Sequence, residues 1–246
     1  MATRLALITG GMGGLGETIS TKMADAGYRV AVTYSSSNKT VGQWIAEMKS
    51  RGYDFRAYAC NVADFESCKA CAEGVSRDLG PVDILVNNAG ITRDGVFKRM
   101  SPSDWHAVIN TNLNSVFNVT RQVVEGMTER AWGRIINISS VNALKGQFGQ
   151  TNYSAAKAGM HGFSKALAQE VVKKGVTVNT VSPGYVETDM VRAMKPEILQ
   201  SIVEQIPMGR LAQPEEIASL VAYLASEEAG YITGANISIN GGLHMV

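Results

Sequence analysis

Short apolar runs alternate along the chain with longer stretches whose apolar residues recur every three or four positions. The first run, Leu5–Thr9, is continuous, and the stretch that follows at Leu15–Ala26 has helical spacing. Short continuous runs are typical of strands buried on both faces, and the longer spacing is typical of amphipathic helices. By the same criteria we predict further strands at Arg29–Tyr34, Phe55–Cys60, Val82–Val86, Arg134–Ile138, Val176–Val181 and Asn236–Ile239. Further helices are predicted at Thr40–Arg51, Asp64–Leu79, Trp105–Glu129, Asn152–Lys173 and Pro214–Leu224.

Strands that alternate with helices in this way build βαβ units with a parallel sheet and right-handed crossovers. The sequence therefore predicts an α/β fold, a Rossmann-type doubly wound parallel sheet of about seven strands with helices on both faces. No linker, repeat or low-complexity tract divides the 246 residues, so we expect a single domain over residues 1–246. Residues 187–212 have the least regular pattern, and we expect them to form a lid over a substrate.

Composition excludes several classes of protein. The chain carries 23 Lys and Arg against 22 Asp and Glu, a net charge of +1, so a strongly basic nucleic-acid binder is not expected. No apolar run reaches the ~20 residues of a membrane span. The first residues also lack the apolar stretch of a signal peptide. We therefore expect a cytoplasmic protein that does not enter membranes.

Residues suited to metal or redox chemistry are few. His106, His161 and His244 are scattered without ligand spacing, so no metal site is expected. Cys68 and Cys71 form a C-x-x-C pair inside a predicted helix, without the second ligand pair or the strand-to-helix turn that zinc and redox motifs need. We interpret the two cysteines as small, partly buried packing residues.

The glycine-rich turn between the first strand and the first helix is a candidate ligand site. The segment Thr9-Gly10-Gly11-Met12-Gly13-Gly14-Leu15-Gly16 lets the backbone approach a pyrophosphate, and the following helix presents N–H groups to it. Glycines also occur in plain turns, but a position at the first βα junction favours dinucleotide binding. The residues expected to bind the dinucleotide here are Gly10, Met12, Gly13, Gly14, Leu15 and Gly16.

The G-x-x-x-G-x-G spacing of this turn departs from G-x-G-x-x-G and resembles the short-chain dehydrogenase/reductase family. Other motifs of that family follow in order: Asn87-Asn88-Ala89-Gly90 after the fourth strand, Ser140 thirteen residues before Tyr153, Lys157, and Pro183-Gly184 after the sixth strand. The resemblance implies an oxidoreductase with a nicotinamide cofactor. It also implies cofactor contacts from Asn61, Val62, Asn88, Ala89, Gly90, Pro183, Gly184, Val186 and Thr188.

The end of the second strand bears on which nicotinamide cofactor binds. NAD enzymes usually carry Asp or Glu there, whereas this chain has Tyr34-Ser35-Ser36-Ser37-Asn38-Lys39. No carboxylate repels a 2′-phosphate, and the hydroxyl of Ser35 and the ammonium of Lys39 suit one. We therefore expect NADP(H), with a solvated loop as the alternative interpretation. The glycine turn has Met12 and Gly13 where many NADP-dependent relatives have a basic residue.

The candidate chemistry rests on Tyr153 and Lys157, which lie four residues apart on one helix face. The ordinary pKa of a tyrosine phenol is about 10, and we expect the nearby ammonium to lower it. Tyr153 then donates a proton to a carbonyl oxygen that Ser140 polarises by hydrogen bonding. By resemblance, Lys157 also holds the nicotinamide ribose, and Asn112 anchors a water that relays the proton to solvent.

The segment between Ser140 and Tyr153 and the ending Asn240-Gly241-Gly242-Leu243-His244-Met245 are similar to those of family members that reduce acetoacetyl-CoA. The resemblance implies NADPH-dependent formation of (R)-3-hydroxybutyryl-CoA for polyhydroxyalkanoate synthesis. Amide side chains suit the pantetheine amides, and an aromatic wall suits a short acyl chain. The implied substrate residues are Asp94, Gln147, Phe148, Gln150, Tyr185 and, near a CoA phosphate, Lys195. Gln147 and Gln150 are alternatively plain solvated loop residues.

Two other functions stay open. A 3-oxoacyl-acyl-carrier-protein reductase has the same chemistry and an overlapping sequence pattern. Its acidic protein partner needs a basic patch, for which Arg130, Lys173 and Lys174 are candidates, unless they are plain helix-end cations. A non-catalytic NADP-binding sensor would keep the glycines and lose Tyr153 or Lys157, both of which are present.

The resemblance also implies a homotetramer, paired through the C-terminal strand and the helices predicted at Trp105–Glu129 and Asn152–Lys173. Small residues on the second of these helices would allow the close approach of a partner helix. Packing of this face inside the same chain is the alternative. The small residues are Ala155, Ala156, Gly159, Gly162 and Ala166.

Overall fold

The strands form one parallel sheet in the order β3-β2-β1-β4-β5-β6-β7. We describe residues 3–192 and 195–245 of the chain from a computed structural model. The strands are β1 (Leu5–Ile8), β2 (Arg29–Tyr34), β3 (Arg56–Ala59), β4 (Ile84–Asn87), β5 (Gly133–Ile138), β6 (Val176–Pro183) and β7 (Asn236–Ile239). The chain reverses its direction of winding between β1 and β4, as in doubly wound sheets. The predicted seven-stranded α/β fold is confirmed.

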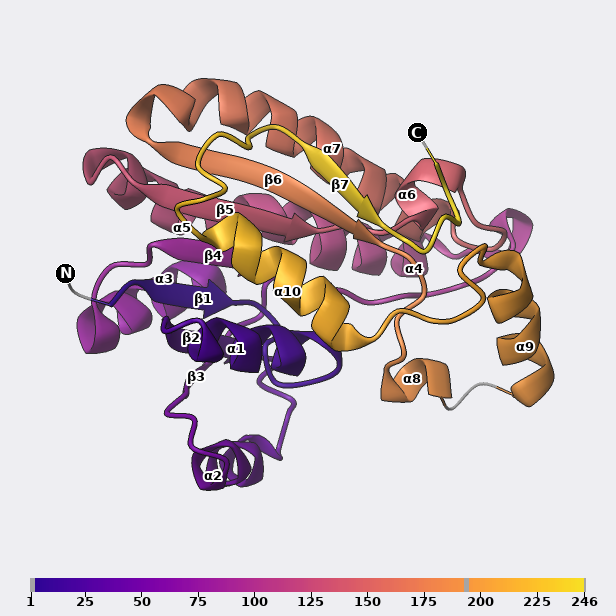
Figure 1. Cartoon of the computed structure of the whole chain (residues 1–246), viewed down its shortest axis with the longest axis horizontal. Helices are drawn as coiled ribbons and strands as arrows, with labels where there is room; N and C mark the ends of the chain where they lie inside the picture. The colour runs from indigo at the N-terminus through magenta and orange to yellow at the C-terminus, as the bar shows by residue number, and fades with distance from the viewer. Residues whose placement is uncertain (1–2, 193–194, 246) are drawn as a thin grey trace.

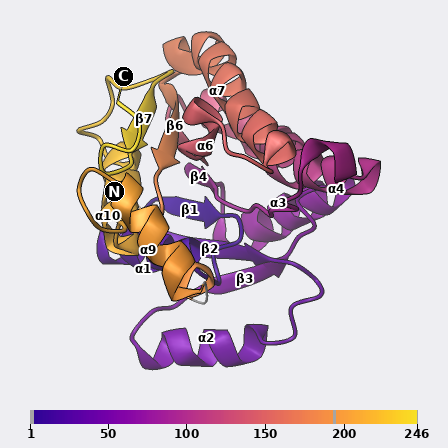
Figure 2. The same ribbon diagram turned by 90° about the vertical axis from the view of Figure 1, so that its right-hand side faces the viewer.

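Helices cover both faces of the sheet (Figure 1). One face packs against α1 (Leu15–Asp25), α2 (Val41–Ser50) and α10 (Pro214–Ala225). The other face packs against α3 (Phe65–Leu79), α5 (Ser115–Glu129) and α7 (Thr151–Val171). Figure 2 shows α7 and α10 on opposite sides of the central strands.

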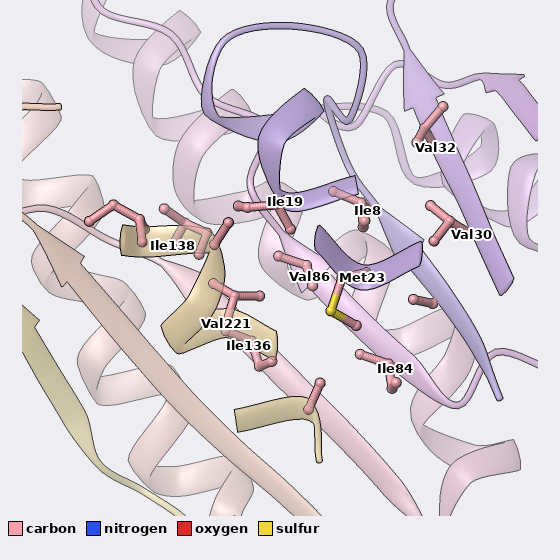
Figure 3. Packing of buried hydrophobic residues seen from close by; sticks show 14 of the residues in the cluster. Ile8, Ile19, Met23, Val30, Val32, Ile84, Val86, Ile136, Ile138 and Val221 are labelled. Atoms are coloured by element: carbon pink, nitrogen blue, oxygen red, sulfur yellow. The ribbon is translucent and has the colours of Figure 1, made fainter. Parts of the chain in front are cut away.

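The two hydrophobic cores follow from the alternation of side chains along the strands. In β1, Ala6 and Ile8 point to the core under α1 and α10, whereas Leu5 and Leu7 point to the core under α3 and α5. All four side chains are buried. Figure 3 shows Ile8 and its neighbours of β4 and β5 packed against α1 and α10. The continuous apolar runs of the sequence therefore reflect strands that are covered on both sides.

The prediction of a single long helix at Trp105–Glu129 is wrong. The chain forms α4 (Pro102–Ile109), a π-helical turn at Asn110–Asn114, and then α5. The N-cap Ser101 accepts a hydrogen bond from the backbone N–H of Asp104, and Pro102 stands at a position where helices tolerate proline. The π turn contains Asn112, whose side chain binds the backbone of Ile91 on the neighbouring loop. A turn of this kind inside a helix is frequently found at functional sites.

Residues 187–212 are more regular than predicted. They contain α8 (Asp189–Arg192) and α9 (Pro196–Gln205), and Pro196 again begins a helix. A short bridge between Val186 and Ala212 closes the base of this segment. Residues 193 and 194 within the segment lie outside the described residues. A further short helix, α6 (Asn142–Lys145), lies between β5 and α7 and was not predicted.

The cysteines are buried free thiols. Cys68 and Cys71 lie on α3 and contribute to the core between α3, α5 and the sheet, which confirms the packing interpretation. Among residues 3–192 and 195–245, no three His, Cys, Asp or Glu side chains are grouped as a metal site requires. No helix in the same part of the chain is long and apolar enough to cross a membrane.

Candidate active site

Two clefts adjoin at the carboxyl ends of the strands. The first, called here the α7 cleft, has a volume of about 330 Å³ and is lined by Ser140, Tyr153 and Lys157 among others. The second, called the β2 cleft, has a volume of about 410 Å³ and lies where β1, β2 and β3 end. Both clefts are lined by Asn88, Gly90 and Ile91, so they form one continuous site. Ligands of doubly wound sheets bind at this edge, where the winding reverses.

The glycine turn is packed too tightly for side chains at its end. A Cβ atom on Gly16 would lie 2.2 Å from the carbonyl oxygen of Gly10 and 2.8 Å from Nδ2 of Asn88. Gly10 has a φ of +63°, a conformation that favours glycine. The amide of Asn88 donates to the carbonyl oxygen of Thr9 over 3.0 Å. Loops that are far apart in sequence thus build one backbone surface suited to a pyrophosphate.

Two threonines hold these loops together and were missed in the sequence. Oγ1 of Thr9 accepts hydrogen bonds from the backbone N–H groups of Asn88 and Ala89, over 2.9 and 3.0 Å. Oγ1 of Thr33 accepts from the N–H of Gly10 over 3.2 Å. Both threonines are buried at the ends of β1 and β2. A hydroxyl at the carboxyl end of an otherwise apolar strand is the signal that could have found them.

Most of the predicted cofactor residues line the two clefts. The β2 cleft contains Gly10, Gly13, Ser35, Asn61, Val62, Asn88, Ala89 and Gly90. The α7 cleft contains Leu15, Pro183, Gly184, Val186 and Thr188. Gly14 and Gly16 form the end of the turn, whereas Met12 packs against the core and the exposed Lys39 lines neither cleft. The β2 cleft also contains Thr33, Tyr34, Cys60, Ile91 and Thr111, which were not predicted.

These surroundings fit a nicotinamide dinucleotide. The space that a Cβ of Gly16 would fill is bounded by backbone and amide groups. The β2 cleft offers the hydroxyl of Ser35 and the amide of Asn61 at the end where an adenosine binds in doubly wound sheets. None of the described residues that line this cleft is Asp or Glu.

Ser140, Tyr153 and Lys157 come together in the α7 cleft. Nζ of Lys157 lies 5.7 Å from the centre of the Tyr153 ring and donates to the carbonyl oxygen of Ile138 over 2.7 Å. Oγ of Ser140 accepts a hydrogen bond from the backbone N–H of Asn142 over 3.1 Å. The hydroxyl proton of Ser140 is therefore available to the phenol oxygen or to a substrate oxygen.

Burial decides the pKa values of the tyrosine and the lysine. It raises the pKa of the Tyr153 phenol above its ordinary value, against the opposing effect of a hydrogen bond from Ser140, and the charge of Asp94 raises it further. It lowers the pKa of Lys157 to about 8, because the buried ammonium has lost its water. The expected lowering of the tyrosine pKa is therefore wrong for the protein alone. At neutral pH the phenol keeps its proton, which is the form that a proton donor needs.

Asn112 lies near Lys157, with Gly90 beside both side chains. It is fully buried, and its side chain accepts from the N–H of Ile91 over 2.8 Å and donates to the C=O of the same residue over 2.9 Å. A Cβ on Gly90 would lie 3.1 Å from Oδ1 of Asn112 and 3.5 Å from Nζ of Lys157. Asn112 thus fixes the loop after β4 beside the lysine. Its role with a relay water stays a prediction.

The predicted substrate residues divide into two groups. Gln150 and Tyr185 line the α7 cleft, and Nε2 of Gln150 donates to Oδ2 of Asp94 over 2.8 Å. The side-chain oxygen Oε1 of Gln150 accepts from Nδ2 of Asn142 over 3.0 Å, so Asn142 joins the group although it was not predicted. The other predicted residues are outside the lining of the cleft. Asp94 is exposed and contacts it only through Gln150. Gln147 binds Lys145, Phe148 is 86% exposed, and Lys195 precedes α9 on the surface.

The fold and this constellation define an oxidoreductase that uses a nicotinamide cofactor, and the chain belongs to the short-chain dehydrogenase/reductase family. A family described as enoyl-(acyl carrier protein) reductase matches residues 10–244. The chain is 57% identical to an acetoacetyl-CoA reductase of Cupriavidus necator, over 100% of both proteins. It is 55% identical to an acetoacetyl-CoA reductase of Allochromatium vinosum, over 98% of this chain and 99% of the relative. It is also 44% identical to a 3-oxoacyl-(acyl-carrier-protein) reductase of Vibrio harveyi, over 99% and 98%.

Replacement of Gly16 by alanine should weaken dinucleotide binding. The added methyl group would displace the carbonyl of Gly10 and the amide of Asn88, and overpacking of this kind costs about 1–3 kcal/mol. We expect the Kd for the reduced dinucleotide to rise roughly 10- to 100-fold in a fluorescence titration. Gly42→Ala on α2 is the matched control, because nothing lies within 4 Å of a Cβ at this exposed position, which lines neither cleft. An unchanged Kd in Gly16→Ala would contradict the proposed pyrophosphate surface.

The rate of carbonyl reduction should fall as the pH rises through about 8. Below this pH, Lys157 is an ammonium beside Tyr153; above it, the charge is lost while the phenol stays protonated. The reaction then loses the positive charge that stabilises the tyrosinate formed on proton transfer. A profile of kcat/KM against pH tests this, with the melting temperature followed at each pH. A rate that stays level across this region in the folded protein would show that Lys157 is not needed as a cation.

Proposed function

We propose that this protein uses NADPH to reduce acetoacetyl-CoA to (R)-3-hydroxybutyryl-CoA. The observation that carries the proposal is the convergence of Ser140, Tyr153 and Lys157 in the α7 cleft, which is continuous with the β2 cleft beside the glycine turn. The curated relatives that support the substrate include acetoacetyl-CoA reductases that are 48–57% identical to this chain over nearly its full length.

The chemistry divides between the cofactor and the side chains. Bound NADPH supplies the hydride that forms the new C–H bond at the 3-oxo carbon. Ser140 donates a hydrogen bond to the 3-oxo oxygen and polarises the carbonyl. As the π bond opens, the electron pair goes to this oxygen, which takes the proton of the Tyr153 phenol. The Lys157 ammonium then stabilises the tyrosinate until a proton returns from solvent, for which we propose a water anchored near Asn112.

The side chains at the wall of the α7 cleft suit the pantetheine arm of coenzyme A. Gln150 is oriented by Asp94 and Asn142, so its amide is fixed at the wall of the cleft. Tyr185 supplies an aromatic wall for the short acyl chain. We propose that residues 187–212 close over the substrate as a lid of a single domain. In that closed state Gln147, Phe148 and Lys195 would meet the pantetheine and phosphate portions.

The preference for NADPH is supported by the end of β2. The β2 cleft presents the hydroxyl of Ser35, and no acidic side chain among its described lining residues would repel a 2′-phosphate. Oγ of Ser35 lies 2.9 Å from Oγ of Ser37, so this loop offers more than one hydroxyl. Lys39 is exposed nearby in the chain and supplies a positive charge.

A carrier-protein substrate is disfavoured by the position of the basic residues proposed for it. Arg130 ends α5 before β5, and Lys173 and Lys174 precede β6, so all three lie at the amino ends of the strands. Ser140 and Tyr153 lie beyond the opposite, carboxyl ends. The guanidinium of Arg130 also donates to the carbonyl of Val82 over 2.7 Å and to Asp83 over 3.3 Å.

We propose a homotetramer that pairs partly through α5 and α7. Ala155, Gly162 and Ala166 are exposed along α7, and Phe117 of α5 is 51% exposed although it is aromatic. Two members of the predicted small-residue face are not available: Ala156 is buried, and a Cβ on Gly159 would meet Leu113 of the same chain. The face of α7 that we propose for pairing is therefore smaller than the small-residue face predicted from the sequence.

The first test is an NADPH absorbance assay with acetoacetyl-CoA, run beside acetoacetyl-carrier protein and beside NADH. We expect the highest kcat/KM with NADPH and the CoA thioester. A higher value with the carrier protein would assign the enzyme to fatty-acid elongation, and a higher value with NADH would refute the cofactor proposal.

Tyr153→Phe should bind NADPH normally and lose at least about 100-fold in kcat, because it lacks the proton donor. Undiminished reduction by this variant would refute the mechanism, and a wild-type protein that only binds NADPH would be a sensor.

The tetramer is tested by light scattering at micromolar concentration. We expect a mass of four chains for the wild type and a smaller mass for Ala155→Arg, which places charge on the proposed interface. A wild-type monomer would contradict the proposal.

A further inference from the structure

His161 lies on the same face of α7 as the catalytic pair. It follows Lys157 by four residues and Tyr153 by eight, and this spacing keeps all three side chains on one side of a helix. That side faces the ends of β5 and β6. The imidazole is half-buried, and none of the reaction steps described above uses it.

The imidazole contacts the hydroxyl of the residue just after β5 and one hydroxyl on β6. Nε2 of His161 lies 3.0 Å from Oγ of Ser139 and 3.4 Å from Oγ of Ser182. Ser139 donates its own proton to the carbonyl oxygen of Lys157 over 2.9 Å, and Ser182 donates to Oδ1 of Asn236 over 2.6 Å. Because both hydroxyl protons are used, both oxygens accept, and the tautomer of His161 is the one with a proton on Nε2.

The two serines stand immediately before functional segments. Ser139 precedes Ser140, and Ser182 precedes the Pro183-Gly184-Tyr185 segment, which lines the α7 cleft. The carbonyl that Ser139 binds belongs to Lys157 itself. One imidazole therefore connects the three parts of the chain that supply the polarising serine, the floor of the cleft and the proton donor.

We infer that His161 is a positioning residue, which holds Ser140 at the distance from Tyr153 and Lys157 that proton transfer requires. The inference rests on the proposed reductase activity. His161 is not among the residues that line the α7 cleft, so it acts on Ser140 indirectly, through its contacts with Ser139 and Ser182.

The electrostatic surroundings agree with this role. Burial lowers the pKa of His161, and the ammonium of Lys165 lowers it further, so the imidazole is neutral at neutral pH. Protonation in acid would add a proton to Nδ1 and leave the Nε2–H in place. The contact with the serines is thus kept in both charge states, as a fixed support requires.

The experiment compares His161→Leu, which removes the donor, with His161→Gln, whose side-chain amide restores an N–H at a similar reach. For His161→Leu we expect kcat for acetoacetyl-CoA to fall at least about 10-fold, since small displacements of reacting groups are costly. We expect KM for both substrates to stay within about 3-fold, because the binding surfaces are unchanged. His161→Gln should regain most of the lost kcat. His106→Leu is the matched control, because His106 is exposed on α4, away from these contacts.

A second variant keeps the inference testable if the leucine substitution lowers stability. Ser139→Ala removes the nearer of the two hydroxyls through which His161 acts, so Ser139→Ala combined with His161→Leu should be little worse than the more damaging single change. Melting temperatures of all variants separate loss of folding from loss of alignment.

Several outcomes would overturn the inference. An unchanged kcat in His161→Leu, an equal loss in His161→Gln, or a double variant whose loss is the product of the single losses would each contradict it. If the wild type fails to reduce acetoacetyl-CoA, the proposed substrate is wrong. The same variants are then compared on ethyl acetoacetate, a smaller 3-oxo ester, so that the two failures are distinguished.

Discussion

The site depends on a row of buried hydrogen bonds that fixes neighbouring strands beneath α7. The amide of Asn87 on β4 donates to Oδ1 of Asn137 on β5 over 2.8 Å, and Asn137 donates in turn to Oγ of Ser164 on α7 over 2.8 Å. Thr180 on β6 donates to the same hydroxyl over 2.9 Å. Buried amides and hydroxyls are costly when unpaired, so this row admits one arrangement of three strands and one helix. Tyr153 and Lys157 lie on this helix, α7, and Ser140 follows the middle strand, β5.

The elements of the fold were predictable because their cause is local. Strands buried on both faces need continuous apolar runs, and such runs are visible without any tertiary contact. The π turn at Asn110–Asn114 was not predictable in the same way. It accompanies the pairing of Asn112 with the backbone of Ile91, twenty-one residues earlier in sequence. The helices in residues 187–212 were missed for a different reason: α8 is only one turn long, and α9 begins at a proline that also suits a loop.

The residues of the candidate site also differ in whether the local sequence or a distant contact defines their role. The motifs of the family predicted the glycine turn and the catalytic group of Ser140, Tyr153 and Lys157, because these motifs keep a fixed order and spacing along the chain. They did not predict Thr9, Thr33 or Asn142, whose roles lie in contacts with distant loops. Phe148 and Lys195 show the converse case. They were predicted from resemblance, yet their side chains are exposed and lie outside the lining of the α7 cleft.

Burial of the tyrosine and the lysine in one cleft has a consequence for the direction of the chemistry. Because burial penalises every charged form, it raises the pKa of the phenol and lowers the pKa of the ammonium to about 8. The ordinary order of acidities, with tyrosine slightly more acidic than lysine, is thereby reversed. As the pH rises, the lysine loses its proton first, and the tyrosinate–ammonium pair is not the resting state of the protein alone. Tyr153 therefore holds its proton until a substrate oxygen gains negative charge and can accept it. Such a site favours protonation of a nascent alkoxide, which is the requirement of carbonyl reduction.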